Sequence, residues 1–93
     1  MSGSLHELLF EALLALRNPD ECSAFLADLL TPQECDAVAQ RIAVARALQE
    51  GATYEQAAAQ TGASSATISR VRRALFLGSG GYEMVLRRIS GIE

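Results

Sequence analysis

The sequence predicts an all-α protein built from six helices. Hydrophobic residues make up 49% of the 93 residues and charged residues 20%, a balance that supports a packed core and argues against disorder. Aromatic residues make up only 5% and tryptophan is absent, so the core has to be aliphatic. Proline occurs only twice, and apolar residues recur with the period of a helix along most of the chain.

The first predicted helix covers residues 5–16, after a capping-box pattern formed by Ser4 and Glu7. One stripe of this helix is apolar: Leu5, Leu8, Leu9, Ala12, Leu13 and Leu16. Phe10 and Leu14 lie outside the stripe, so the helix is apolar around most of its circumference. Because one core of this size cannot cover so much apolar surface, the pattern predicts a homodimer; a monomeric bundle wrapped around this helix is the alternative.

Two proline-containing segments open the second and third helices. In "NPDE", Asn18 is the predicted cap and Pro19 the first helical residue; in "TPQE", Thr31 and Pro32 take the same places. The third helix is predicted from Pro32 to about Glu50 and ends at a glycine. Its predicted apolar face consists of Val38, Ile42, Ala45 and Leu48.

Three shorter helices complete the prediction. Thr53 and Gln56 start a helix that ends at Gly62, Ser64 caps one that continues to about Phe76, and residues 82–89 form the last after the break "GSGG". In the last helix we expect Met84, Val85 and Ile89 to face inward.

Residues 53–76 have the outline of a helix-turn-helix motif. Ala58 is small where the second helix should cross the first, and Gly62 tolerates the positive φ of the turn. Apolar or small residues occupy the positions expected to face the core: Ala57, Thr61, Ala63, Ile68 and Val71. The chain then forms a single domain over residues 1–93, with dimerisation helices in 4–50, the helix-turn-helix in 53–76 and a C-terminal helix in 82–90.

The exposed face of the second helix of the motif predicts DNA binding. The chain has a net charge of −3, yet residues 52–93 hold five arginines against three glutamates. We expect Ser65, Ala66, Thr67 and Ser69 to face bases, and Arg70, Arg72 and Arg73 to position the helix. Thr53 and Tyr54 are expected to contact phosphates at the start of the motif.

Two other interpretations of this face remain open. It can be an ordinary solvated helix, or the helix pair can bind protein as an interaction module in a helical homodimer. The acidic N-terminal half and Glu55 favour the second.

Other classes of function find no support in the sequence. It contains no nucleophile elbow, P-loop or dinucleotide fingerprint, and Cys22, Cys35 and His6 lack the spacing of metal ligands. We therefore expect neither an enzyme, nor a metal site, nor a cofactor. No apolar run is long enough to cross a bilayer and no signal peptide opens the sequence, so we expect a cytoplasmic protein with no membrane partner.

The segment "LTPQECDAVAQRIAVARALQEGATYEQAAAQTGASSATISRVRRAL" resembles the core of the Trp repressor superfamily, especially its YerC/YecD-like branch. The resemblance covers about residues 5–90 and depends on the "LTPxE" helix start, the arginine in the middle of the long helix and the "TGASxATISR" segment. It implies an intertwined, all-helical homodimer that binds near-palindromic operator DNA through two helix-turn-helix units, as a repressor-like transcriptional regulator.

The resemblance also implies a vestigial ligand pocket. Two arginines that anchor tryptophan in ligand-binding members match Arg41 and Arg70. Val71 stands where those members have glycine, and Ala74 where they have a serine that meets the ligand's amino group. We therefore expect the space between the two arginines to be closed to indole and tryptophan not to be a partner. The basic DNA contacts of the family's first motif helix fall on Glu55 and Ala58, which weakens the expected phosphate binding.

Overall fold

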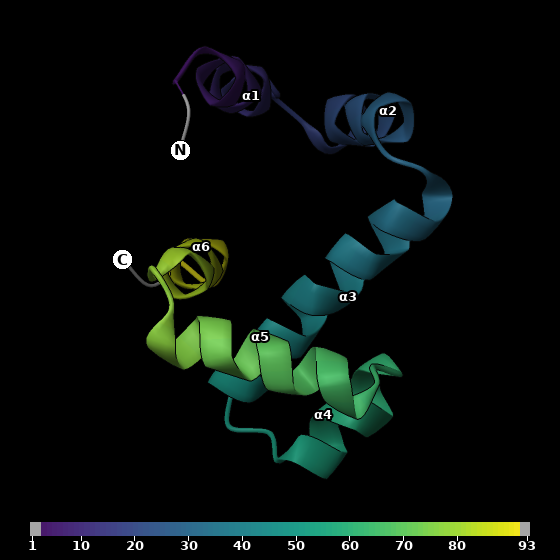
Figure 1. Cartoon of the computed structure of the whole chain (residues 1–93), viewed down its shortest axis with the longest axis vertical. Coiled ribbons are helices and arrows are strands. Elements are labelled where there is room, and N and C mark those ends of the chain that lie inside the picture. Colours follow the sequence, from purple (N-terminus) through teal and green to yellow (C-terminus); the bar gives the residue numbers. More distant parts are fainter. Residues whose placement is uncertain (1–2, 92–93) are drawn as a thin grey trace. The chain divides into compact units, whose positions relative to one another are not determined.

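The computed structural model describes residues 3–91 and contains six helices in that range, with no strand among the described residues (Figure 1). The predicted all-α class is confirmed. The helices are α1 (Gly3–Leu14), α2 (Pro19–Leu29), α3 (Pro32–Gln49), α4 (Tyr54–Thr61), α5 (Ser65–Leu77) and α6 (Gly81–Ile89). None of the helices within residues 3–91 combines the length and the apolar character that crossing a membrane requires.

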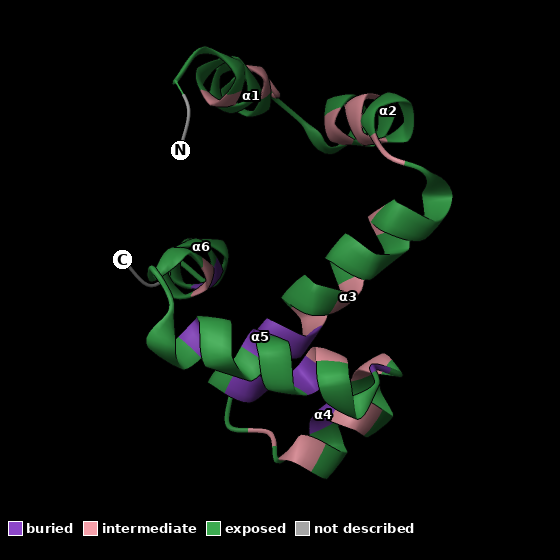
Figure 2. Ribbon diagram, in the orientation of Figure 1, coloured by how far each residue is buried: buried purple, intermediate pink, exposed green. Residues whose placement is uncertain are grey.

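The chain divides into two compact units, residues 1–35 and 36–93, and the division falls inside α3. In the first unit, α1 begins at Gly3, so Ser4 is a helical residue and not the predicted cap. Leu14 ends α1 two residues earlier than predicted; after it the Leu16 amide bonds only three residues back, to Leu13 (3.3 Å). Neither α1 nor α2 holds a buried residue (Figure 2).

The predicted caps of α2 and α3 are confirmed. The Asn18 side chain accepts a hydrogen bond from the Glu21 amide (2.9 Å). At α3 the Thr31 amide donates to the Glu34 carboxylate (2.9 Å), and the Glu34 amide donates to the Thr31 hydroxyl (3.1 Å). The backbone N–H of Thr31, aided by its side chain, lowers the pKa of Glu34. Because the folded state holds the charged form, the stability this carboxylate adds is present above its ordinary pKa and fades as the pH falls below it.

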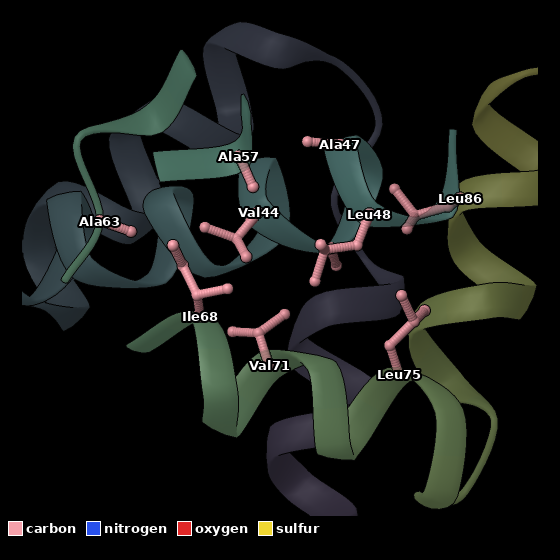
Figure 3. Packing of buried hydrophobic residues seen from close by; sticks show 10 residues of the cluster. Val44, Ala47, Leu48, Ala57, Ala63, Ile68, Val71, Leu75 and Leu86 are labelled. Carbon is pink, nitrogen blue, oxygen red and sulfur yellow. The ribbon is translucent and has the colours of Figure 1, made fainter. Parts of the chain in front are cut away.

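The buried core lies in the second unit, where the end of α3 meets α4, α5 and α6 (Figure 3). Val44 and Ile68 are the largest fully buried side chains, and Val71 points into the same cluster. Leu86 of α6 packs with Leu75 at the far end of the cluster (Figure 3). The aliphatic core expected from the composition is confirmed for this unit.

Two predicted apolar faces differ from the structure. On α3, Ala45 and Leu48 are buried as predicted, but Val38 and Ile42 are exposed and the unpredicted Val44 is fully buried. On α6, Leu86 is the buried residue, and the three residues expected to face inward are exposed: Met84, Val85 and Ile89. The core contacts only the C-terminal part of α3, which Val38 and Ile42 precede, and a single residue of α6. A periodic apolar pattern does not show how far along a helix the core extends.

The joint between α5 and α6 depends on a residue without a side chain. Gly78 ends α5, and its amide donates to the Ala74 carbonyl (3.0 Å). A Cβ atom at this position would lie 2.3 Å from that carbonyl oxygen, which is backbone and cannot move aside. Glycine is therefore required where the chain leaves α5 for α6.

Ile68→Ala tests the core. Removing three carbons from a fully buried position should lower the free energy of unfolding by about 2–5 kcal/mol. The neighbouring Ser69→Ala changes an exposed position and should stay within about 0.5 kcal/mol of the wild type. Urea unfolding at one fixed protein concentration measures both, and equal stability of the two variants would contradict this description of the core.

Candidate nucleic-acid interface

The helices α4 and α5 form a helix-turn-helix with a short turn whose two ends are capped. Thr53 caps α4 in a reciprocal capping box with Gln56, and Ser64 caps α5 by accepting from the Thr67 amide (3.2 Å). Between them, Gly62 has φ 71°, in the left-handed region that the sequence predicted, and its amide donates to the Ala58 carbonyl (2.8 Å). Local sequence therefore fixes where each helix begins and ends.

Side chains from outside the turn hold it in place. The Thr61 hydroxyl donates to the Ala57 carbonyl (2.7 Å) and accepts from the Ala63 amide (3.2 Å). The Gln40 side chain on α3 donates to the Thr61 carbonyl (3.1 Å), which ties the last residue of α4 to the longest helix. Gln40 was not predicted as part of the motif, because a contact between residues this far apart in the sequence leaves no periodic signal.

The buried and exposed sides of α5 separate as predicted. Ile68, Val71 and Leu75 are buried, which fixes the rotation of the helix about its own axis. The predicted readers and arginines lie outside this buried stripe; Thr67 is half-buried and the others are exposed: Ser65, Ala66, Ser69, Arg70, Arg72 and Arg73. The other predicted core positions of the motif are buried for Ala57 and Ala63 and half-buried for Thr61.

Two of the three arginines of α5 line hollows, and they line different ones. Arg72 lines a hollow of about 260 Å³ together with Thr53, Tyr54 and Phe76, so that the two predicted phosphate contacts and one predicted positioning arginine lie together at the start of the motif. Arg70 lines another hollow, and Arg73 is exposed and lines neither. Within the described part of the chain, no acidic side chain forms an ion pair with any of these three arginines. Their positive charge is therefore available to an anionic partner.

The two residues at the start of α4 differ in their hydrogen bonding. The Thr53 hydroxyl oxygen accepts a hydrogen bond from the Gln56 amide (3.1 Å), which leaves the hydrogen of the hydroxyl free to be donated to an acceptor. The Tyr54 hydroxyl donates its single hydrogen to the Ser65 carbonyl (2.9 Å). Thr53 can therefore donate to a phosphate in this arrangement, whereas Tyr54 has a partner within the protein.

The residues of the predicted vestigial pocket also come together. Arg41, Arg70, Val71 and Ala74 line a hollow of about 320 Å³, with Thr67 and Tyr82 completing its wall. The Val71 side chain is only 3% exposed and points into the core, in line with Ile68 one turn earlier, so it forms the floor of the hollow (Figure 3). That this space is closed to indole stays a prediction. Tyr82 was not predicted as a lining residue because it lies beyond the glycine-rich break in the sequence.

Known proteins are similar to this chain in sequence and in fold. The family model described as Trp repressor protein matches residues 4–90. The uncharacterized protein YerC of Bacillus subtilis (strain 168) is 45% identical over the whole of this chain and 89% of its own length.

Two solved structures are similar as well. A protein proposed to be a Trp repressor from Staphylococcus aureus is 42% identical, with a TM-score of 0.93 over 99% of this chain and 91% of its own. A TrpR-like protein from Eubacterium eligens ATCC 27750 is 45% identical, with a TM-score of 0.87 over 94% of this chain and 90% of its own. The matched segment contains five of the described helices in full and all of α1 except Gly3, and this chain belongs to the Trp repressor family.

Proposed function

We propose that this chain is a sequence-specific, DNA-binding transcriptional regulator of the repressor type, acting as a homodimer in the cytoplasm. The observation that carries the proposal is the outer face of α5, where small hydroxyl side chains stand beside arginines that no acidic residue of the described chain neutralises. Membership of the Trp repressor family supports the same function. Neither a cofactor nor catalysis is part of this proposal.

Phosphate binding is assigned to the start of the motif. Arg72 supplies a charge beside the Thr53 hydroxyl, and the first amides of α4 favour an anion at the same place. Glu55, exposed on the first turn of α4, opposes this charge and limits the affinity for DNA of any sequence. Specificity then depends more on base contacts than in a strongly basic protein.

Base reading is assigned to the N-terminal half of α5. Ser65, Ala66 and Ser69 are small and exposed, so they let the helix approach base edges closely. The Thr67 hydroxyl accepts from the Ser64 hydroxyl (3.2 Å), which orients it and leaves its own hydrogen to donate. Arg70 and Arg73 can reach either the backbone or a guanine edge.

The homodimer is supported by apolar surface that one chain leaves uncovered. On α1, Leu5 is 77% exposed and Leu14 85% exposed. In the second unit, apolar side chains line a hollow of about 630 Å³ that includes Ile42, Tyr82, Val85, Leu86 and Ile89. Soluble monomers rarely expose large apolar patches, and a second copy is the occupant that the family implies.

Sedimentation equilibrium at micromolar concentration tests the dimer. We expect twice the mass of one chain for the wild type. Leu8→Glu places a charge in the exposed apolar row of α1 and should shift the equilibrium towards the monomer, whereas Glu11→Gln on the same helix should not. A wild-type monomer at all concentrations would remove the dimer and the two-half-site argument.

Selection from a random DNA pool, followed by titration of the selected duplex, tests DNA binding. Two recognition helices in a two-fold dimer should select a near-palindrome with half-sites roughly one turn, or about 34 Å, apart. Arg72→Ala should weaken binding to all sequences and lower the salt slope by about one unit, because a phosphate contact is lost. Thr67→Val should instead change which sequence is preferred.

Arg46→Ala is the matched control, because it removes an exposed arginine from α3 outside the motif. It should leave the sequence preference of the protein unchanged and cost less affinity than Arg72→Ala. If no sequence is enriched while the chain retains protein partners, the helix pair is an interaction module and the DNA proposal is wrong.

Calorimetry with tryptophan tests the ligand response. The hollow offers two guanidinium groups to a carboxylate, but no acidic side chain lines it, and Ala74 has no hydroxyl for the ligand's ammonium group. A missing hydrogen bond to a charged group costs about 1.5–3 kcal/mol, or roughly tenfold to a hundredfold in affinity. We therefore expect no saturable binding at micromolar tryptophan. Ala74→Ser should strengthen any residual binding, and micromolar binding by the wild type would overturn this expectation.

A further inference from the structure

Tyr54 connects the beginnings of the two motif helices. It is the first residue of α4, and its hydroxyl donates to the carbonyl of Ser65, the first residue of α5, over 2.9 Å. The two residues are eleven positions apart in the sequence, so this bond is tertiary and does not arise within one helix. It joins the two helix ends that the proposed function assigns to DNA.

The ring and the hydroxyl of Tyr54 have separate roles. The ring is half-buried and packs against the core cluster, which holds the side chain in one orientation. The Ser65 carbonyl has two lone pairs, one of which serves the regular helical bond from the amide four residues later, in Ser69. The hydroxyl takes up the second, so it adds a contact to the first turn of α5 without displacing a helical hydrogen bond.

This arrangement is unsuited to a phosphate contact through the Tyr54 hydroxyl. A phenol has one hydrogen to donate, and a phosphate oxygen is only an acceptor. With that hydrogen directed at Ser65, the hydroxyl offers only lone pairs to the DNA side. The neighbouring Thr53 keeps its donor hydrogen and is the residue suited to the phosphate.

We propose that Tyr54 is a positioning residue: its hydroxyl bond to Ser65 fixes the first turn of α5 relative to α4, and thereby sets how accurately the reading residues meet base edges. This inference rests on the proposed DNA binding and replaces the sequence-based expectation that Tyr54 contacts a phosphate. Phosphate contacts are long-ranged and tolerate a small displacement, whereas hydrogen bonds to base edges do not. Losing the bond therefore reduces discrimination more than it reduces general affinity.

Tyr54→Phe removes the hydroxyl and keeps the packed ring. In titrations of the selected duplex and a random-sequence duplex, the variant should lose about three- to tenfold in affinity for the selected one and little for the random one. Its salt slope should equal that of the wild type, because no phosphate contact is removed. Equal losses on both duplexes would show that the hydroxyl contacts a phosphate and would overturn the proposal.

Amide hydrogen exchange in the free protein provides an independent measurement. The amides of Ile68, which donates to Ser64, and of Ser69 should exchange about three- to tenfold faster in Tyr54→Phe, while the amide of Val44 in α3 should not change. Tyr82→Phe removes the same hydroxyl from a tyrosine of α6 and should leave the exchange of Ile68 and Ser69 as in the wild type.

Failure of the proposed DNA binding and failure of the positioning role are distinguishable, because the first is measured on the wild type and the second on Tyr54→Phe. If the wild type selects no DNA sequence, the proposed function fails and the positioning role fails with it. If the wild type is selective and Tyr54→Phe keeps both its discrimination and its exchange rates, only the positioning role is wrong.

Discussion

The packing of α5 on the end of α3 is the contact on which the recognition motif depends. Val44 and Ile68 are both fully buried and face each other across this junction (Figure 3). Once Ile68, Val71 and Leu75 are committed to the core, the opposite side of α5 has to face solvent, with its hydroxyls and arginines in a fixed order. In so small a core each of these contacts matters, because few others restrain the rotation of the helix.

Local signals made much of the fold predictable from the sequence. Helix caps and turn glycines act within a few residues of their partners, so a single sequence is enough to predict them. Examples are the caps Asn18, Thr31 and Ser64 and the left-handed Gly62. Contacts between residues far apart in the sequence were not predictable. Gln40 on Thr61 and Tyr54 on Ser65 depend on how helices cross, which no periodicity encodes.

The sequence predicted which residues belong to the candidate site better than it predicted how their side chains are arranged. The exposed residues of α5 were identified because the helical period separates them from Ile68 and Val71. The direction of the Val71 side chain was not predicted. A comparison with the glycine of related proteins shows which atoms are added at this position, but not where they point. The exposure of Val85 and Ile89 was not predicted for a similar reason: an apolar residue indicates that its side chain is to be covered, but not by which part of the protein or of a partner.

The exposed apolar stripe of α1 affects how the protein is synthesised. Residues 3–35 leave the ribosome before the segment that contains the core, and they hold no buried residue of their own. Their leucines therefore stay in contact with water, or with chaperones, until another surface is complete. In the proposed homodimer two such chains have to meet, and several ribosomes on one message would bring them together early. The rate of synthesis, and not only the final concentration, would then influence how much of the proposed dimer forms.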